Sequence, residues 1–429
     1  MMGGDDPPWT TKTHIGEHSM SRTAFDFAPL LRPNLPPAAV RYSGFPAFNF
    51  VGGHNDAATT PVEGLIAAAA SVLMREGATL ATYGLNSGPL GYIGLRQFLA
   101  KKLHRQAGIT CSTDEILITS GSNQGLDLIN QVLVAPGDTI LMEQASYGGA
   151  ISRFTRHGAN LVGVALDKEG LQPDALEAAI SNLKANGVRP KYIYTIPTVQ
   201  NPTGAIMGPQ RRADILAIAA NHAIPLVEDE CYSDLLWTPE RPKAMKAMTD
   251  LGNVIFVGSF SKSIAPALRV GYVVADWSIL SRMLASKTDS GTGALEQMVL
   301  AEFCEKHFDT HVGTLNKVLK RKLDVLVEAL GEHFGTAAEF EVPKGGIFVW
   351  IKLPDGVDTQ KLAQAALKAG IAFNPGPEWA IDKQWGRPRL RICFANPTET
   401  ALRKGVAALA EVCHREMGVP ARIGNVALS

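Results

Sequence analysis

The chain has 429 residues, of which 46 % are hydrophobic and 19 % are charged. This length exceeds the roughly 250 to 300 residues at which a single hydrophobic core stops growing, so we expect two domains, and the composition excludes a wholly disordered chain. Lysine plus arginine equals aspartate plus glutamate at 41 each, so the net charge gives no reason to expect nucleic acid as a partner.

Residues 1–47 are expected to form an N-terminal arm. Its first 19 residues include acidic residues and prolines but no apolar stretch of signal-peptide length. The longest apolar runs, such as residues 65–73, fall well short of the roughly 20 residues that a membrane span requires. The five cysteines are scattered, without the close pairs of metal sites or disulfide frameworks. We therefore expect a cytoplasmic protein with no metal site and no membrane association.

Residues 48–305 are expected to form a large domain in which helices alternate with short strands rich in β-branched residues. This alternation predicts a mostly parallel sheet with helices on both faces. Polar residues follow the expected strands: a Gly-Ser turn after 116–119, the loop at Asn201 after 191–195, Glu228-Asp229-Glu230 after 226–227, and Ser259 after 254–257. Ligands of open α/β sheets bind beyond the carboxyl ends of the strands, so we expect these polar residues to converge.

Residues 306–429 are expected to form a smaller α+β domain. A long helical pattern over residues 292–330 leads into it. Strands are expected near residues 340–353 and 389–394, with a helix at 359–369 between them. The predicted fold class is therefore α/β, with a second, smaller domain.

Four segments carry groups that are suited to chemistry. They are Asn201-Pro202-Thr203-Gly204, Asp229-Glu230-Cys231-Tyr232, Ser259-Phe260-Ser261-Lys262-Ser263, and Leu268-Arg269-Val270-Gly271. Taken alone each is ordinary, because an aspartate after a strand is often a helix N-cap, Asn-Pro often starts a turn, and a lysine beside serine is usually a surface residue. Their order, their spacing and their positions after strands set them apart.

In this order the segments resemble those of the class I/II aminotransferases, which belong to the fold-type I family of enzymes that depend on pyridoxal phosphate. The resemblance covers roughly residues 48–412 and rests most strongly on the Ser-x-Ser-Lys turn followed by Leu-Arg-x-Gly. It implies a mostly parallel sheet of the seven-stranded type in a large cofactor domain, a smaller α+β domain, pyridoxal 5′-phosphate as cofactor, and a homodimer.

The resemblance assigns the catalytic roles to Lys262, Asp229 and Tyr232. Lys262 would hold the cofactor as a Schiff base and, once displaced by an amino acid, move the α-proton as base and then acid. Asp229 would keep the pyridine nitrogen protonated by raising the pKa of that nitrogen. Its two glutamate neighbours are competitors that only the family pattern sets aside. Tyr232 and Asn201 would donate hydrogen bonds to the phenolic oxygen of the cofactor.

Further cofactor contacts are implied along the chain. Ser122, Asn123 and Gln124 open an expected helix, and the free N–H groups at a helix start attract anions such as phosphate. The resemblance adds Ser259, Ser261 and Arg269 around the phosphate, Tyr147 stacked on the ring, and Tyr83 reaching the phosphate of the neighbouring subunit. A Gly-Ser turn before a helix would be weak evidence on its own, because ordinary capped helices begin in the same way.

The substrate carboxylate is assigned by resemblance to Arg391, with Gly53 and Asn201 beside it. A guanidinium presents a fork of donors that suits a carboxylate. Arg389 lies two residues earlier and would share the same face of an expected strand. Only the family pattern selects Arg391, so Arg389 stays open as a second contact or a surface charge.

The substrate side chain is less closely defined. Phe48 and Phe50 favour a bulky apolar or aromatic amino acid. His54-Asn55-Asp56 stands where relatives usually have a turn that contains proline, and residues 86–90 resemble an insertion at the expected dimer boundary. A histidine near the substrate would be a specificity contact, although a lone histidine is more often structural.

The expected function is transfer of an amino group between an α-amino acid and an α-keto acid in two half-reactions. The same cofactor supports β-lyase and racemase chemistry, and both stay open as alternatives. Some transcription regulators use an aminotransferase-like domain to sense an effector, but they place a winged helix-turn-helix before it. Only about 50 residues precede the matched region here, and they contain no basic recognition helix. We therefore expect an enzyme that does not bind nucleic acid.

Overall fold

The computed structural model describes residues 25–420, apart from residues 33–34, 37, 40, 43 and 239. The chain divides into two compact units, Met1–Gly44 and Phe45–Ser429. Within the first unit the structure describes one 3-10 turn, Ala28–Leu30. Every sheet that the structure describes belongs to the second unit.

A seven-stranded sheet forms the centre of the second unit, with the strand order β2-β10-β9-β8-β7-β3-β4. Its strands are β2 (Ile116–Thr119), β3 (Thr139–Glu143), β4 (Asn160–Val164), β7 (Ile193–Thr195), β8 (Leu226–Asp229), β9 (Val254–Ser259) and β10 (Gly271–Val274). The direction of β10 is opposite to that of the other six strands, which are parallel to one another. Most of these strands are buried along their whole length, as expected for a parallel sheet that is covered on both faces. The predicted mostly parallel sheet is confirmed.

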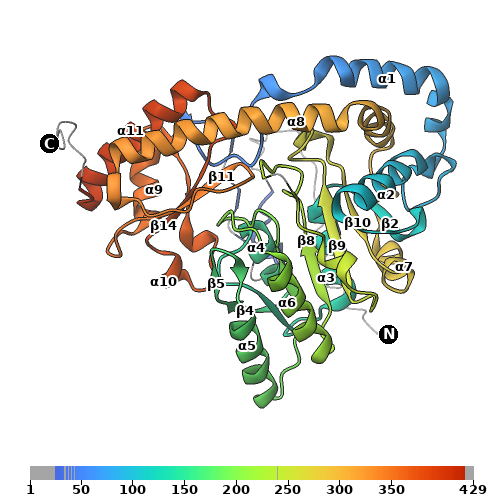
Figure 1. Ribbon diagram of the computed structural model, residues 1–429, viewed down its shortest axis with the longest axis horizontal. Coiled ribbons are helices and arrows are strands. Elements are labelled where there is room, and N and C mark those ends of the chain that lie inside the picture. Colours follow the sequence, from blue (N-terminus) through green and yellow to red (C-terminus); the bar gives the residue numbers. More distant parts are fainter. Residues whose placement is uncertain are drawn as a thin grey trace, which may run out of the picture. The chain divides into compact units, whose positions relative to one another are not determined.

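Helices cover both faces of the sheet (Figure 1). They include α2 (Ile93–Ala107), α3 (Ser122–Leu133), α4 (Gly148–Arg156), α5 (Pro173–Ala185), α6 (Pro209–Asn221) and α7 (Trp277–Ser286). Helix α1 (Val62–Glu76) lies farther out and packs on α8 (Ala294–His333). Alternate residues of β2 show the two faces. Ile116 and Ile118 pack in one cluster with α2, whereas Leu117 packs in another with α3 and α7. Side chains of a strand alternate in direction, so both clusters are needed to bury them.

The C-terminal region contains an antiparallel sheet of three strands in the order β11-β14-β13. The elements are β11 (Phe348–Lys352), α9 (Thr359–Lys368), β13 (Asn374–Pro375), α10 (Lys383–Gly386), β14 (Arg389–Cys393) and α11 (Glu399–Met417). β1 (Phe48–Asn49) pairs with β12 (Ile371–Ala372) of this region. The expected helix and both expected strands are present, although β11 begins later than predicted. Pro343 and the Gly345-Gly346 pair precede β11, and such residues interrupt strands.

Helix α8 (Ala294–His333) is 40 residues long and runs past the predicted domain boundary between residues 305 and 306. It packs against α1 and α2, and against α11 of the C-terminal region. Its orange ribbon in Figure 1 extends along both regions. The two regions therefore share one continuous helix, and their division into separate domains stays a prediction.

The start of α3 lies directly on β10, because Gly271 has no side chain. A Cβ atom on Gly271 would lie 2.5 Å from the backbone nitrogen of Ser122 and 2.6 Å from the carbonyl carbon of Gly121. Gly121 itself has a φ of +78°, a conformation that glycine adopts without steric cost. The close approach of two backbones thus fixes where α3 begins above the sheet.

Substitution of Gly271 by alanine is expected to lower the free energy of unfolding by about 1–3 kcal/mol, because the methyl group must push two backbones apart. Gly313→Ala is a suitable control, since Gly313 lies within α8 with open space around it. Alanine there should raise the free energy of unfolding by roughly 0.5–1 kcal/mol. Urea denaturation measures both changes, and a Gly271→Ala variant as stable as the wild type would contradict this account of the packing.

Candidate active site

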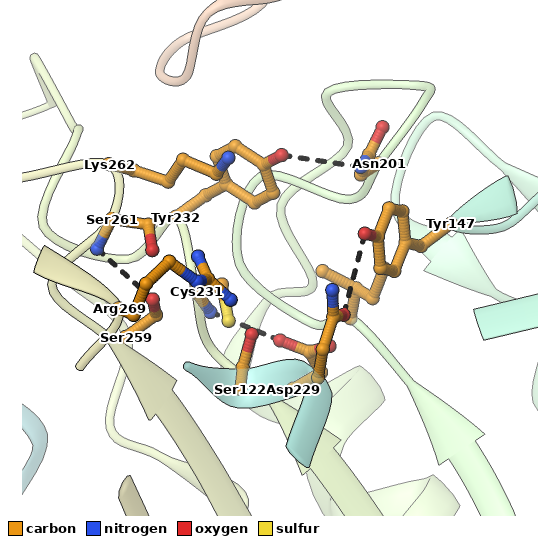
Figure 2. Close-up of a pocket in the computed structure, with 12 residues that line it drawn as sticks. Ser122, Tyr147, Asn201, Asp229, Cys231, Tyr232, Ser259, Ser261, Lys262 and Arg269 are labelled. Atoms are coloured by element: carbon orange, nitrogen blue, oxygen red, sulfur yellow. Dashed lines mark hydrogen bonds between the residues drawn. The ribbon is translucent and has the colours of Figure 1, made fainter. Parts of the chain in front are cut away.

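A cavity of about 530 Å³ lies at the carboxyl ends of the central strands. Most of the predicted site residues line it, namely Ser122, Asn123, Tyr147, Asn201, Asp229, Tyr232, Ser259, Ser261, Lys262 and Arg269. Figure 2 shows these side chains gathered from several loops around one space. The expected convergence of the polar segments is therefore present in the folded chain. Ile196 and Cys231 also line the cavity and were not predicted.

Lys262 lies in the turn that follows β9. Its Nζ donates a hydrogen bond to the carbonyl oxygen of Gly53 and lies 5.8 Å from the centre of the Tyr232 ring. Burial lowers the pKa of the Lys262 amine, because the charged form loses its hydration. A larger fraction of this amine is therefore neutral and nucleophilic than at an exposed lysine.

Asp229 ends β8 and is buried beneath the cavity. It accepts hydrogen bonds from the hydroxyl of Tyr194 at 2.7 Å and the backbone N–H of Cys231 at 3.2 Å. Burial raises the pKa of Asp229, because the charged form loses its hydration and these donors oppose the shift only in part. A cationic group that entered the cavity would therefore find a carboxylate that still needs a partner.

The glutamates on either side of Asp229 point away from the cavity. Glu228 accepts hydrogen bonds from the backbone of Met245 and Lys246, and Glu230 accepts one from the hydroxyl of Thr198. Successive residues of a strand face opposite sides, so neighbours of Asp229 cannot share its direction. The structure therefore distinguishes Asp229 from its two competitors.

Asn201 joins two other predicted site residues. Its Nδ2 donates to the Tyr232 hydroxyl at 3.3 Å, and its Oδ1 accepts from Nη1 of Arg391 at 3.0 Å. Burial raises the pKa of Tyr232 well above its ordinary value, so the phenol stays protonated and can donate a hydrogen bond. The ring of Tyr232 packs edge-on against Phe348 of β11, with the ring centres 5.1 Å apart.

Donors of several kinds meet at one end of the cavity. Ser122 and Asn123 form the first turn of α3, where backbone N–H groups have no helical acceptor. The hydroxyl of Ser259 accepts from the backbone N–H of Ser261 at 3.1 Å. Arg269 donates to the carbonyl oxygens of Pro266 and Ser120 at 3.2 and 3.3 Å. Free N–H groups, hydroxyls and a guanidinium together suit a bound phosphate.

Arg391 is only 3 % exposed, and all of its hydrogen-bond acceptors are uncharged. Besides Asn201 they are Oδ1 of Asn374 at 2.8 Å and the carbonyl oxygen of Val51 at 3.3 Å. Its Nε has no partner among the described residues. A buried guanidinium with a free donor is suited to a carboxylate ligand.

Trp379 is a site residue that the sequence interpretation missed. The guanidinium carbon of Arg391 lies 3.8 Å from the centre of the Trp379 ring and 5.1 Å from the centre of the Phe348 ring. The Trp379 ring also lies 6.0 Å from that of Tyr147. Its role depends on packing against Arg391 and Tyr147, and no local sequence pattern assigned it. Arg389, the open competitor of Arg391, stacks instead on Trp385 at 3.7 Å.

Some predicted residues lie outside the cavity. The amide of Gln124 is engaged, since its Nε2 donates to Asp289 at 2.7 Å and its Oε1 accepts from the backbone N–H of Ser120 at 2.7 Å. Tyr83 is 88 % exposed in the turn Tyr83–Asn86. Their cofactor contacts stay predictions, and that of Tyr83 involves a neighbouring subunit.

The aromatic residues that favoured a bulky substrate also lie elsewhere. Phe50 is fully buried in the C-terminal core, and Phe48 packs against the same core. Both rings lie close to Gly405 of α11, where an added Cβ would collide with them. The use of Phe48 and Phe50 as pocket residues was wrong, because they pair with β12 and fill the core beneath it.

Comparisons with known proteins agree with this geometry. The family model for aminotransferase class I and II matches residues 52–409. An aromatic-amino-acid aminotransferase of Thermococcus litoralis is 32 % identical over 372 residues, covering 86 % of this chain and 88 % of the relative. The structure of a Pyrococcus horikoshii kynurenine aminotransferase superimposes with a TM-score of 0.82 at 32 % identity, over 87 % of this chain and 92 % of that one.

A relative of another kind is an uncharacterized helix-turn-helix type transcriptional regulator of Bacillus subtilis. It is 35 % identical over 326 residues, which are 75 % of this chain but 65 % of the regulator. About a third of the regulator therefore lies outside the match, whereas the Thermococcus aminotransferase is matched over most of its length.

Proposed function

The chain belongs to the class I and II aminotransferases, and on that premise we propose that Lys262 carries its chemistry and that bulky apolar or aromatic amino acids are its donors. It is a pyridoxal-phosphate-dependent enzyme that moves an amino group between an α-amino acid and an α-keto acid. One observation carries the proposed roles. Lys262 and Asp229 line the same cavity, and Asn201 in its wall is hydrogen-bonded to Arg391.

The residues around the cavity fit pyridoxal 5′-phosphate. Asp229 is a buried carboxylate with no cationic partner in the part of the chain that the structure describes, which suits a protonated ring nitrogen. The cradle at the start of α3 suits the phosphate, with Arg269 as its guanidinium donor. Asn201 and Tyr232 supply donors for the phenolic oxygen, and Tyr147 flanks the ring. When bound, the cofactor supplies an aldehyde and a ring that accepts electrons.

The protein then positions the substrate and moves one proton. Arg391 would bind the carboxylate through its free Nε and so fix the Cα–H bond in space. With cofactor and substrate bound, Lys262 would take the α-proton at its Nζ and later return it. Its lowered pKa favours the neutral form that the first of these steps needs. Tyr232 stays protonated throughout, so its hydroxyl can donate a hydrogen bond to the phenolic oxygen of the cofactor.

Aromatic side chains near the carboxylate site support the proposed donor class. Trp379 lies between Arg391 and Tyr147, so an amino acid held by Arg391 would have an aromatic surface close to it. Such a surface gains from contact with a large apolar or aromatic side chain. Two relatives point in the same direction, because their names specify aromatic amino acids and kynurenine.

A donor screen tests this proposal directly. Each amino acid is mixed with the cofactor-loaded enzyme in the absence of a keto acid, and spectral conversion of the cofactor is followed in a single turnover. Phenylalanine, tyrosine, tryptophan and leucine should react roughly tenfold or more faster than aspartate and glutamate at equal concentration, which is the range that apolar contacts supply. Faster conversion by the acidic donors would contradict the substrate class while leaving amino-group transfer intact.

A reducing, cytoplasmic location is also part of the proposal. The cysteines are all free thiols, at Cys111, Cys231, Cys304, Cys393 and Cys413. Proteins of oxidising compartments commonly pair their cysteines as disulfides, whereas cytosolic proteins keep them reduced. Cys231 lies in the wall of the cavity, where oxidation would place a polar group beside Asp229.

An exposed apolar face on α1 supports the proposed homodimer. Its members, counting the turn that follows α1, are Val62, Ile66, Leu73, Met74 and Leu80. The stretch Val62–Ala81 is long and apolar enough to cross a membrane by length and composition. The expectation that all apolar stretches fall short of a membrane span counted only uninterrupted apolar runs and was therefore too narrow. The opposite side of α1 is tied to α8 by an ion pair of 2.8 Å between Arg75 and Glu302. We propose that a second copy of this chain covers the exposed face and brings Tyr83 to its partner's phosphate cradle.

Charge substitutions on this face should weaken the dimer. Met74 is 82 % exposed and Ile66 is 63 % exposed, so the single chain should still fold with a lysine at either position. An unpaired charge buried between two copies should raise the dissociation constant at least about tenfold. Leu367→Lys on α9, where Leu367 is 58 % exposed, is the matched control. Sedimentation velocity measures the outcome, and a wild-type monomer or unaffected variants would refute the proposed interface.

A further inference from the structure

The segment Phe50-Val51-Gly52-Gly53-His54-Asn55-Asp56, called the strap below, links the C-terminal sheet to the turn that holds Lys262. Its first residues belong to the C-terminal region. The backbone N–H of Phe50 donates to Ala372 at 2.8 Å, and its carbonyl oxygen accepts from the N–H of Cys393 at 2.9 Å. Arg391 reaches the next carbonyl oxygen, that of Val51, at 3.3 Å.

The middle of the strap binds Lys262 at two points. The carbonyl oxygen of Gly53 accepts from the amine of Lys262, and Nδ2 of Asn55 donates to the backbone carbonyl oxygen of Lys262 at 2.7 Å. A Cβ atom on Gly53 would lie 3.3 Å from the amine, so a side chain there would crowd it. Both the amine and the peptide of Lys262 are therefore held by residues more than 200 positions earlier in the chain.

The strap returns to the C-terminal region directly after Asn55. Oδ2 of Asp56 pairs with Nζ of Lys322 on α8 at 2.8 Å, and the same amine donates to the carbonyl oxygen of Ala395 at 2.8 Å. Lys322 is 4 % exposed, so this ion pair is shielded from solvent on one side. Asp56 also accepts from the backbone N–H of Ala58 at 3.1 Å. These contacts fix the backbone on one side of Asn55.

A second side chain holds the residue that follows Lys262. Nε2 of His311 on α8 lies 2.9 Å from the carbonyl oxygen of Ser263. The peptides of Lys262 and Ser263 are thus each tethered from outside the turn, by Asn55 and His311 respectively. A tethered backbone limits movement of Lys262 to its side chain, which must swing between two positions during turnover.

We propose that Asn55 is a positioning residue for Lys262 and that the Asp56–Lys322 ion pair holds Asn55 in place. This inference rests on the proposed function, because it assumes that Lys262 is the lysine that reacts. Asn55 touches neither substrate nor cofactor in this account. It acts by fixing the carbonyl group from which the lysine side chain extends, so that the amine stays within reach of the α-proton.

Asn55→Ala and the isosteric Asn55→Asp both remove the donor and are compared with Asn316→Ala. Asn316 of α8 is a matched control, because its Nδ2 likewise donates to loop carbonyl oxygens, at 3.1 and 3.0 Å, and neither its Oδ1 nor that of Asn55 has a partner among the described residues. Both Asn55 variants should lower kcat about 10- to 100-fold, since small displacements of a reacting group cost this much. KM for the amino donor should change much less, because Arg391 is untouched. Asn316→Ala should keep the wild-type kcat.

A second readout needs neither cofactor nor turnover. In the cofactor-free protein, labelling of the Lys262 amine by an amine-selective reagent is followed against pH by peptide mass spectrometry. Burial keeps the pKa of Lys262 below the ordinary value of 10.5. An amine released from its position gains hydration, so the midpoint pH of the labelling curve should move upward, towards 10.5, in both Asn55 variants. In Asn316→Ala this midpoint should stay at the wild-type value.

Two results would overturn the inference. One is a wild-type kcat with an unchanged labelling midpoint in Asn55→Asp, which preserves the shape of the side chain. The other is an equal loss of kcat in Asn316→Ala, which would indicate a general effect of losing one hydrogen bond. Failure of the proposed function is distinguishable, since a wild-type enzyme that transfers no amino group would still report on Asn55 through the labelling midpoint.

The role of Asp56 is tested with a double-mutant cycle. Asp56→Asn weakens the pair with Lys322 and should reproduce part of the loss of kcat seen in Asn55→Asp. The double variant should be no slower than Asn55→Asp alone, because Asp56 acts through Asn55. Fully additive losses would show that Asp56 affects Lys262 by another route and would refute this part of the inference.

Discussion

Burial of the Arg391 guanidinium among uncharged acceptors is the constraint on which the site depends. A buried cation is costly unless its donors are satisfied. Here they are satisfied by Asn201 and Asn374 and by the aromatic face of Trp379. These partners come from the loop after β7, from β13 and from the residue that follows the turn Gly376–Glu378. The hydrogen bonds and ring contact of this one arginine therefore hold three segments of the chain together, and its free Nε leaves a place for a ligand's carboxylate.

Two further charged groups of the site, Asp229 and Lys262, are organised by the sheet. Asp229 ends β8 and Lys262 follows β9, and these neighbouring parallel strands deliver both groups to the same edge. Neither has a counter-ion among the described residues, and burial shifts both pKa values towards the neutral forms, upward for Asp229 and downward for Lys262. A ligand that brings a cationic ring nitrogen and an aldehyde meets both needs. The cost of burying these groups in the free enzyme is thereby recovered on binding.

Sequence reasoning identified groups that follow strands and missed groups that depend on distant contacts. The strands around Asp229 and Lys262 have local signals in their β-branched runs, so the polar residues after them were predictable. Trp379 and Asn55 were not, because their roles depend on packing between parts of the chain far apart in sequence. Val199 is similar, since its φ of +56° is rare for a β-branched residue and its side chain packs against Gly345 and Gly346. No local pattern signals any of these contacts.

The central claim is that Lys262 is the lysine to which the cofactor becomes attached. Incubation of the protein with pyridoxal 5′-phosphate, reduction with borohydride and peptide mapping by mass spectrometry test it most directly. The account predicts one phosphopyridoxyl group per chain, on the peptide that contains Lys262, because this amine is held in the cavity and its pKa is lowered by burial. Attachment at another lysine, or a Lys262→Ala variant that is labelled equally at a single site, would contradict it.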